Sequence, residues 1–303
     1  MSPQPEQATA VATRDLSGDA LTQEVVDRFA GAEPARFREV MQSLVRHLHA
    51  FARDVQLTED EWWTAIQFLT RAGQFCTETR QELILLSDVL GLSMQVIGIN
   101  HPAVGGSTES TVFGPFYVGN APTYRNGDDL ANGAVGEPCY ISGSVRSTQG
   151  GPIPGAMLDV WQADSDGLYD VQRPDLTEAQ ARGRLTADGD GRFWFWTVKP
   201  IAYPIPEDGP VGELIRSASR STMRPAHVHF MVSADGYTSV TTHVFTAGDP
   251  YLDTDVVFGV KQSLISELVR HEPGTGPDGR RIETPYYTLA YDFTLAPADS
   301  PSR

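Results

Sequence analysis

Residues 226–233 read AHVHFMVS and residues 192–198 read RFWFWTV, two short runs whose composition is typical of β-strands. Further runs of this kind are CYISGSV (139–145), MLDVW (157–161), SVTTHVF (239–245) and YYTLAYDFTLA (286–296). Clusters of Gly, Pro and Asp separate the runs, and the DGDG at 188–191 predicts a hairpin before RFWFWTV. This pattern predicts an antiparallel β-sandwich over residues 106–296, with a solvated tail at 297–303.

The chain before this region has a helical periodicity instead. Apolar residues recur at spacings of three and four from Phe37 to Val55, which predicts one long amphipathic helix. Thr58 and Glu61 fit a capping box that opens another helix. We therefore expect an α+β protein with these parts: residues 1–21 disordered, residues 22–105 a helical dimerisation or linker domain, and residues 106–296 a catalytic β-sandwich.

Composition excludes several classes of partner and location. With 39 acidic and 23 basic side chains among 303 residues, the net charge is -16, which disfavours binding to nucleic acid. The two cysteines, Cys76 and Cys139, suggest neither a disulfide framework nor a thiolate metal site, and fit a reducing cytoplasm. Residues 1–20 lack a secretion-signal pattern, and no stretch approaches the roughly 18 apolar residues of a membrane span. We expect neither secretion nor membrane insertion.

Two histidines separated by one residue stand out within AHVHFMVS. His227 and His229 project from the same face of the predicted strand, so both imidazoles can converge on one metal ion. The plainer interpretation is a pair of solvated histidines on a strand face, and the HxH pair alone does not decide between this and a metal site. Arg224, just upstream, is placed to hold an anionic substrate or intermediate, or to pair with a nearby acid.

Two tyrosines lie in loops that follow predicted strands. Tyr169 follows the turn-like ADSDG, and Tyr203 lies in the proline-rich KPIAYPIP, although most of the ten tyrosines should be ordinary packing residues. A phenolate is a hard anionic donor, and its pKa near ~10 falls sharply only beside a strong Lewis acid. Two tyrosines combined with two histidines would therefore select Fe(III) over Zn(II) or Fe(II).

Three other interpretations of these motifs compete with an iron enzyme. Cupin metalloproteins also present HxH on a strand, but the downstream glutamate is missing, since residues 232–234 read VSA. The stretch ISGSVRSTQGGPIPGAMLDVWQADSDG resembles prealbumin-like binding modules, an interpretation that leaves RPAHVH and the helices unexplained. Calcium binding by ADSDG fails on ligand count, because an EF-hand phase would place Gln162 first and Arg173 twelfth.

Several longer blocks together resemble one enzyme family. LDVWQADSDGLYD (158–170), VKPIAYPIPEDGPVGELI (198–215), RPAHVHFMVSADGY (224–237) and THVFTAGDPY (242–251) look like the intradiol ring-cleavage dioxygenases. The resemblance covers roughly residues 22–296, and the order and spacing of its blocks are highly specific. The N-terminal helices resemble the catechol and hydroxyquinol branches, and ELILLSDVLGLS (82–93) with ESTVFGPFY (109–117) favours the hydroxyquinol branch.

The resemblance implies a role for each matched residue. Tyr169 and His227 would be equatorial ligands of one Fe(III) per chain, and Tyr203 and His229 axial ligands. Tyr203 would also leave the iron and accept a substrate proton, while Arg224 would bind substrate and stabilise negative charge on the ring. The other residues implied to line or support the substrate pocket are Leu85, Asp88, Val112, Phe113, Gly114, Pro115, Phe116, Ile205, Pro206 and His243. His243 stands where catechol enzymes have a glutamine.

The resemblance also implies substrate and partners. An aromatic diol or triol would be opened between adjacent hydroxyls by O2 without an external reductant, giving a cis,cis-muconate. Within the family, a homodimer through the N-terminal helices, with a bound phospholipid, is the implied assembly. The apolar residues around Trp62, Trp63 and Ile66 fit this, although a helical cap packed on its own sandwich has the same periodicity.

Overall fold

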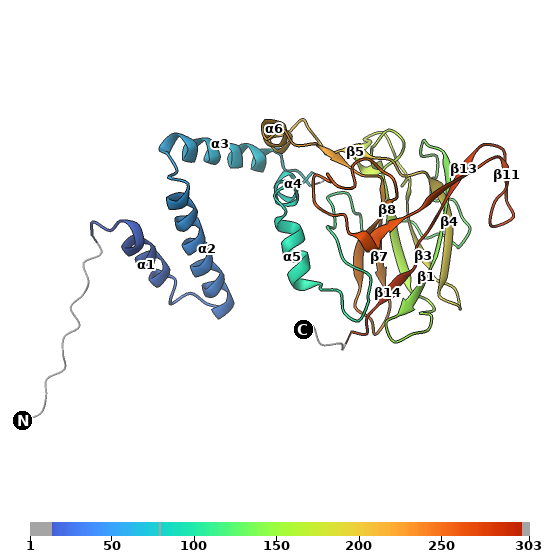
Figure 1. The fold of residues 1–303 in the computed structure, drawn as a ribbon, viewed down its shortest axis with the longest axis horizontal. Helices are drawn as coiled ribbons and strands as arrows, with labels where there is room; N and C mark the ends of the chain where they lie inside the picture. Colours follow the sequence, from blue (N-terminus) through green and yellow to red (C-terminus); the bar gives the residue numbers. More distant parts are fainter. Residues whose placement is uncertain (1–13, 79, 299–303) are drawn as a thin grey trace, which may run out of the picture. The chain divides into compact units, whose positions relative to one another are not determined.

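A computed structural model describes residues 14–78 and 80–298. The chain divides into two compact units after Leu69 (Figure 1). Helices at residues 82–100 therefore belong to the same unit as the strands, whereas the sequence pattern placed the change near residue 105. The pattern in the sequence marks where helices give way to strands, and compactness depends on which elements pack together.

The first unit is built from helices. Its elements are α1 (Gly18–Arg28), α2 (Ala35–Asp54) and the start of α3 (Glu59–Phe75), which continues past the division. Helix α2 coincides with the predicted apolar stripe. The capping box is confirmed, because Glu61 Oε2 accepts from Thr58 N and the Glu61 amide donates to Thr58 Oγ1 at 3.3 Å. The prediction of disorder was wrong for residues 18–21, which begin α1; residues 1–13 lie outside the described chain.

Three more helices lie in the second unit. They are α4 (Glu82–Val89), α5 (Leu92–Asn100) and α6 (Pro210–Ser217). Glu82 is buried, and its carboxylate accepts a hydrogen bond from the Val211 amide at 3.0 Å, in the first turn of α6. An anionic side chain at a helix N-terminus is stabilising, so this contact fixes α4 against α6. Among the described residues no single helix could cross a membrane; α4 and α5 together meet the length and composition criteria but are bent by 80°.

Two five-stranded sheets form most of the β-structure of the second unit. One has the strand order β10-β13-β1-β14, with β4 also pairing with β1, and the other has the order β3-β2-β7-β8-β9. The strands are β1 (Pro138–Ser147), β2 (Met157–Trp161), β3 (Arg182–Thr186), β4 (Arg192–Val198), β7 (His227–Ser233), β8 (Val240–Thr246), β9 (Ile265–Ser266), β10 (Leu268–His271), β13 (Tyr286–Ala290) and β14 (Phe293–Leu295). Two small sheets pair β5 (Tyr203–Pro204) with β6 (Met223–Arg224) and β11 (Gly274–Thr275) with β12 (Arg281–Ile282). Short 3-10 helices cover Asp170–Gln172 and Gln262–Leu264.

The sheets are mixed, so the prediction of an antiparallel sandwich needs correction. β13 and β14 both run parallel to β1, and β9 runs parallel to β8. Parallel neighbours cannot be joined by a hairpin and come from distant parts of the chain, which local turn signals do not reveal. Gly143 lies where β13 gives way to β14, and a Cβ there would lie 1.8 Å from the Tyr291 carbonyl oxygen, so only glycine fits.

The sandwich core lies between the two large sheets. Ring contacts cross it, with Phe230 of β7 at 6.2 Å from Phe193 and 4.9 Å from Phe293. Because side chains alternate along a strand, Phe230 points into this core while His227 and His229 project from the opposite face of β7. That opposite face carries the candidate site.

Candidate metal centre

Segments from three parts of the chain bring four donor side chains to the outer face of β7. Register places Tyr203 of β5 directly opposite Arg224 of β6, three residues before His227. Tyr169 precedes the short 3-10 helix, and its amide donates to the Gln172 side chain at 2.9 Å. All four donor residues predicted from the sequence, Tyr169, Tyr203, His227 and His229, are buried here.

Their donor atoms form a closed ring. The Tyr169 and Tyr203 hydroxyl oxygens are 2.8 Å apart, and Tyr203 Oη lies 3.3 Å from His227 Nε2. His227 Nε2 lies 3.2 Å from His229 Nε2, which lies 2.8 Å from Tyr169 Oη. Ligands about 2.0–2.2 Å from one ion lie roughly 3 Å apart when they are nearly perpendicular. The four atoms therefore fit around a single metal ion.

The protonation of these groups also suits a metal ion. Burial, followed by the charge of Arg224, holds the pKa of His227 well below its usual range, and burial does the same for His229. Both imidazoles are therefore neutral, the form that binds metals. Burial raises the pKa of Tyr169 and Tyr203, so their phenols ionise only if a cation compensates the charge. His227 Nδ1 lies 2.7 Å from the Pro225 carbonyl oxygen, which leaves Nε2 for the ion.

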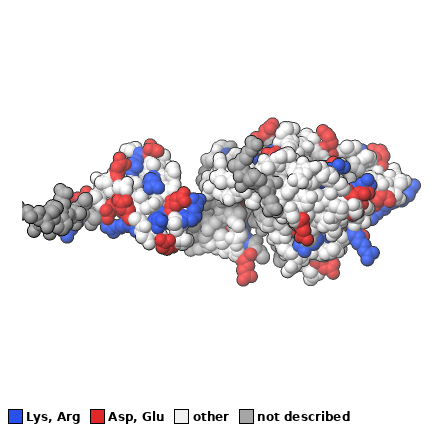
Figure 2. Space-filling view, turned by 90° about the horizontal axis from the view of Figure 1, so that it is seen from below, with Lys and Arg blue, Asp and Glu red and all other residues white. Residues whose placement is uncertain are grey.

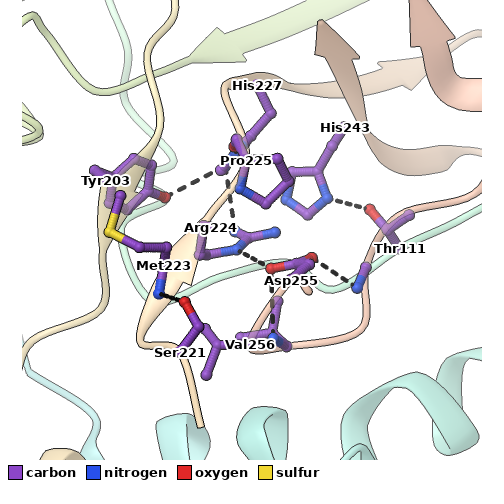
Figure 3. A network of polar contacts seen from close by, with 12 residues as sticks. Thr111, Tyr203, Ser221, Met223, Arg224, Pro225, His227, His243, Asp255 and Val256 are labelled. Carbon is purple, nitrogen blue, oxygen red and sulfur yellow. Dashed lines mark hydrogen bonds and ion pairs between the residues drawn. The ribbon is translucent and has the colours of Figure 1, made fainter. Parts of the chain in front are cut away.

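A third histidine stands on the same face. His243 is the partner of His229 in the register of β7 and β8, and the two ring centroids are 4.1 Å apart. Together with His227 these histidines could offer three nitrogens within 4.8 Å of one another. The three histidine nitrogens are therefore more widely spaced than the four donor atoms that include the tyrosine oxygens, where neighbouring atoms are at most 3.3 Å apart. His243 Nδ1 instead contacts Thr111 Oγ1 at 2.6 Å, on the side shown in Figure 3.

Arg224 is a buried cation beside the ring of donors. Its Nε lies 3.2 Å from Asp255 Oδ1, and its Nη1 lies 3.2 Å from His227 Nε2 (Figure 3). Burial lowers the pKa of Arg224, but Asp255 and Tyr203 outweigh this and raise it, so the guanidinium stays charged. Its Nη2 is buried and has no partner within the described chain, so it can serve a bound anionic group.

A cavity opens beside the donors. The residues that line it are Leu85, Asp88, Val112, Gly114, Pro115, Phe116, Tyr203, Ile205, Pro206, Arg224, His229 and Val257. Six of them also line an outer cleft of about 590 Å³: Leu85, Pro115, Phe116, Tyr203, Ile205 and Pro206. The inner cavity measures about 20 Å³, so an aromatic ring would occupy the junction of the two.

Two of the residues assigned to the substrate pocket do not line this cavity. Phe113 packs on Tyr117 at 4.6 Å and on Trp161 at 5.9 Å between ring centroids, and its side chain is partly exposed. His243 lies behind His229, against Thr111. Phe113 does not line the cavity although Val112 and Gly114 do, because the backbone turns at Gly114, where φ is +75°. A Cβ at Gly114 would lie 3.1 Å from the His229 ring.

Comparison with known proteins defines the family. A family model described as "Dioxygenase" matches residues 112–297, and one described as "Catechol dioxygenase N terminus" matches residues 34–108. The chain belongs to the intradiol ring-cleavage dioxygenases. It is therefore an enzyme, and the cupin and non-catalytic binding-module interpretations are set aside. The family implies non-haem iron, an aromatic diol or triol as substrate and O2.

Several relatives of this dioxygenase carry more specific names. It is 53% identical to "6-chlorohydroxyquinol 1,2-dioxygenase" from Cupriavidus pinatubonensis, over 91% of this chain and 96% of the relative. It is 52% identical to "Hydroxyquinol 1,2-dioxygenase" from Rhodococcus opacus, over 91% and 93%. The solved structure of hydroxyquinol 1,2-dioxygenase from Pseudomonas putida DLL-E4 matches with a TM-score of 0.85 and 45% identity, covering 91% of this chain and 97% of that one.

Some residues near the site were missed by the sequence analysis. Asp255 pairs with Arg224, and Val257 lines the cavity, yet both lie in DTDVVFG, which has no pattern that marks a site. Arg182 and Trp161 were also missed. The ring of Trp161 stacks on His229 at 4.7 Å and 17°. Only its place in the LDVWQ block could have drawn attention to Trp161.

The acidic side chains of the turn at 164–167 contact a nearby arginine and the turn's own backbone. Arg173 Nη2 lies 2.7 Å from Asp166 Oδ2 and also contacts Asp164. The Asp164 carboxylate in addition accepts hydrogen bonds from the amides of Asp166 and Leu168. These contacts hold the segment in a turn that leads to Tyr169, and the ADSDG motif predicts such a turn.

Proposed function

We propose that this dioxygenase cleaves hydroxyquinol (benzene-1,2,4-triol) between adjacent hydroxyls, using one Fe(III) per chain. Tyr169, Tyr203, His227 and His229 would hold the iron. The closed ring of four buried donor atoms carries this proposal, because its two phenols and two neutral imidazoles suit a hard, highly charged ion. The names of the relatives support the choice of substrate.

The chemistry requires both a metal and the surrounding residues. Ferric iron, when bound, supplies the Lewis acidity and electron demand that let a coordinated aromatic diol react with O2 without an external reductant. The carbon–carbon bond between the two adjacent hydroxyl-bearing carbons breaks, and both atoms of O2 enter the product, 3-hydroxy-cis,cis-muconate, which is a tautomer of maleylacetate. Tyr203 lines the cavity, so its phenolate can take a substrate proton there. Arg224, whose Nη2 has no partner among the described residues, offsets negative charge on the aromatic ring of the substrate.

Oxygen uptake by purified protein, measured side by side with hydroxyquinol and catechol, tests the activity. We expect uptake without added cofactor, a larger kcat/KM for hydroxyquinol, and a ring-opened product in the absorption spectrum. A preference for catechol would reject the hydroxyquinol assignment and leave the intradiol reaction intact. Absence of uptake with both substrates in iron-loaded protein would contradict the proposal as a whole.

Asp88 is our candidate partner for the third hydroxyl of hydroxyquinol. It lines the inner cavity and is 3% exposed; burial raises the pKa of this carboxyl, while Ser93 and Arg224 lower it. A buried hydroxyl without a partner costs roughly 1–3 kcal/mol. Asp88→Ala should therefore lower kcat/KM for hydroxyquinol about tenfold or more and affect catechol much less.

A neighbouring serine provides the control for Asp88. Ser87 precedes Asp88 in α4, contacts Ser93 Oγ at 2.9 Å and does not line the cavity. Ser87→Ala should leave the ratio of kcat/KM values for the two substrates unchanged. If Asp88→Ala lowers both values equally, Asp88 is a structural residue and the proposed contact is wrong.

We also propose that residues 22–105 form a helical dimerisation region, with a phospholipid bound among its helices, in a cytoplasmic protein that binds no nucleic acid. Six apolar side chains of the α2 segment are 45–55% exposed: Phe37, Val40, Leu44, Leu48, Phe51 and Val55. An apolar stripe of this size needs a cover. On the face seen in Figure 2, acidic and basic side chains are interspersed, without a large basic patch.

Light scattering tests the assembly. The wild type should have twice the mass of one 33.1 kDa chain at micromolar concentration, and Leu44→Glu combined with Leu48→Glu should reduce it to one chain, because two charges would enter an apolar interface. The matched control is Arg46→Glu, a charged change on the same helix. A monomeric wild type contradicts the dimer. Lipid extraction and mass spectrometry of the wild type would show whether phospholipid is bound.

A further inference from the structure

Arg182 is a second buried arginine of the site, and no role has been assigned to it so far. It is the first residue of β3 and is 3% exposed. In the strand register, Arg182 of β3 pairs with Trp161 of β2, and Trp161 pairs with His229 of β7. Arg182 therefore lies on the same face of the sheet as the donor side chains. Arg182 does not line the cavity or belong to the donor ring, so any effect on the reaction must pass through other residues.

The Arg182 guanidinium connects two segments that lie on either side of the donor Tyr169. Its Nε lies 2.9 Å from Asp170 Oδ2, and its Nη2 lies 2.6 Å from Asp170 Oδ1. The same Nη2 donates to the Phe116 carbonyl oxygen at 2.8 Å. Asp170 is the residue directly after Tyr169. The Phe116 ring stacks on the Tyr169 ring with a centroid distance of 4.5 Å and an angle of 25°.

These contacts restrain Tyr169 from two sides. One side is the backbone that carries Tyr169, held through Asp170; the other is the ring packed against its phenol, held through the Phe116 backbone. The rigid fork of an arginine can serve a carboxylate and a carbonyl at once, whereas a lysine is a single point of charge. Arg182 forms an ion pair with Asp170, and lysine would keep the positive charge, so a lysine variant tests the geometry of the fork.

We propose that Arg182 is a positioning residue, which sets the Tyr169 phenol relative to the other three donors through Asp170 and the Phe116 carbonyl. This inference rests on the proposed function, in which Tyr169 is an iron ligand. Small displacements at a reacting centre are costly, since a shift of about 1 Å can reduce the rate about a hundredfold. A purely structural ion pair would affect stability but not the environment of the tyrosine ligand.

Arg182→Lys in the full-length, iron-loaded protein tests the proposal. We expect the variant to fold, its tyrosinate-to-iron absorption band in visible light to shift, and its iron to be lost faster to a chelator. The kcat should fall about tenfold to a hundredfold, with KM changed less than about threefold. Loss of iron from a folded variant also supports the proposal, because it shows that the ligand has been displaced.

Two further variants keep the test decisive. Arg184→Lys is the matched control: Arg184 makes a similar fork to Asp159 two residues along the same strand, with Nε 2.8 Å from Oδ1. Asp170→Asn replaces Arg182→Lys if that variant does not fold, because it retains the size of the side chain and the Phe116 contact. An unchanged band and kcat in the folded variant, or equal changes in Arg184→Lys, would overturn the proposal. A wild type without an iron-dependent visible band would instead reject the proposed function.

Discussion

Replacing Tyr169 by phenylalanine is expected to bleach the visible colour of the iron-loaded protein and to abolish measurable turnover. The phenol oxygen lies 2.8 Å from both Tyr203 Oη and His229 Nε2, so its loss opens the ring of donors on two sides. Removing an outer partner of a metal ligand already costs about 10–100-fold, so removing the ligand itself should cost more than about a hundredfold. Iron analysis, the visible spectrum and kcat together measure the effect.

Tyr140 supplies the control for this change. It is a buried tyrosine that packs against Trp196, away from the donors, with a centroid distance of 5.3 Å. Tyr140→Phe removes the same atom and should retain iron, colour and turnover. Full iron content and activity in Tyr169→Phe would contradict the ligand assignment, whatever the control shows.

The histidine pair could be predicted from the sequence because it depends on local geometry alone. Alternation along one strand places His227 and His229 on one face, and the apolar residues between and after them show which face is the core. The two tyrosines depend on long-range structure: Tyr169 and Tyr203 lie 34 residues apart but their oxygens touch. Only the resemblance to a family connected them before the structure did.

The hydrogen-bonding partners of the site residues could not be predicted from the sequence either, because they too depend on long-range structure. Arg224 was singled out, but its carboxylate, Asp255, lies 31 residues further along the chain among several other acids. The chain has 39 acidic side chains, and the one that pairs with Arg224 is determined by the path of the loop after β8 back to the site. Sequence patterns thus identify the chemical groups, and the fold decides which groups meet.

Fold elements show the same division between local and long-range information. Helix α2 and the capping box of α3 follow from spacing within a few residues, and both were predicted. The parallel pairing of β1 with β13 joins Cys139 to Tyr287, and nothing near either residue specifies its direction. Mixed sheets were therefore missed although the strands themselves were found.

The pair of Arg224 and Asp255 allows catalysis to be separated from stability. The Arg224 and Asp255 side chains, which pair in Figure 3, are 6% and 2% exposed. Asp255 also accepts a hydrogen bond from the Gly259 amide at 2.9 Å. Arg224→Met leaves the carboxylate buried without its cation, which should lower the free energy of unfolding by about 3–5 kcal/mol. The same change removes the cation beside the substrate and should lower kcat about 10²–10³-fold.

Adding Asp255→Asn to Arg224→Met should restore much of the stability but none of the turnover. Asparagine keeps an oxygen for the Gly259 amide and removes the uncompensated charge, so the two substitutions should not be additive in urea denaturation. Turnover depends on a cation at Arg224, which the double variant still lacks. If kcat recovers together with stability in the double variant, at matched iron content, Arg224 acts only as the partner of Asp255 and has no role in the chemistry.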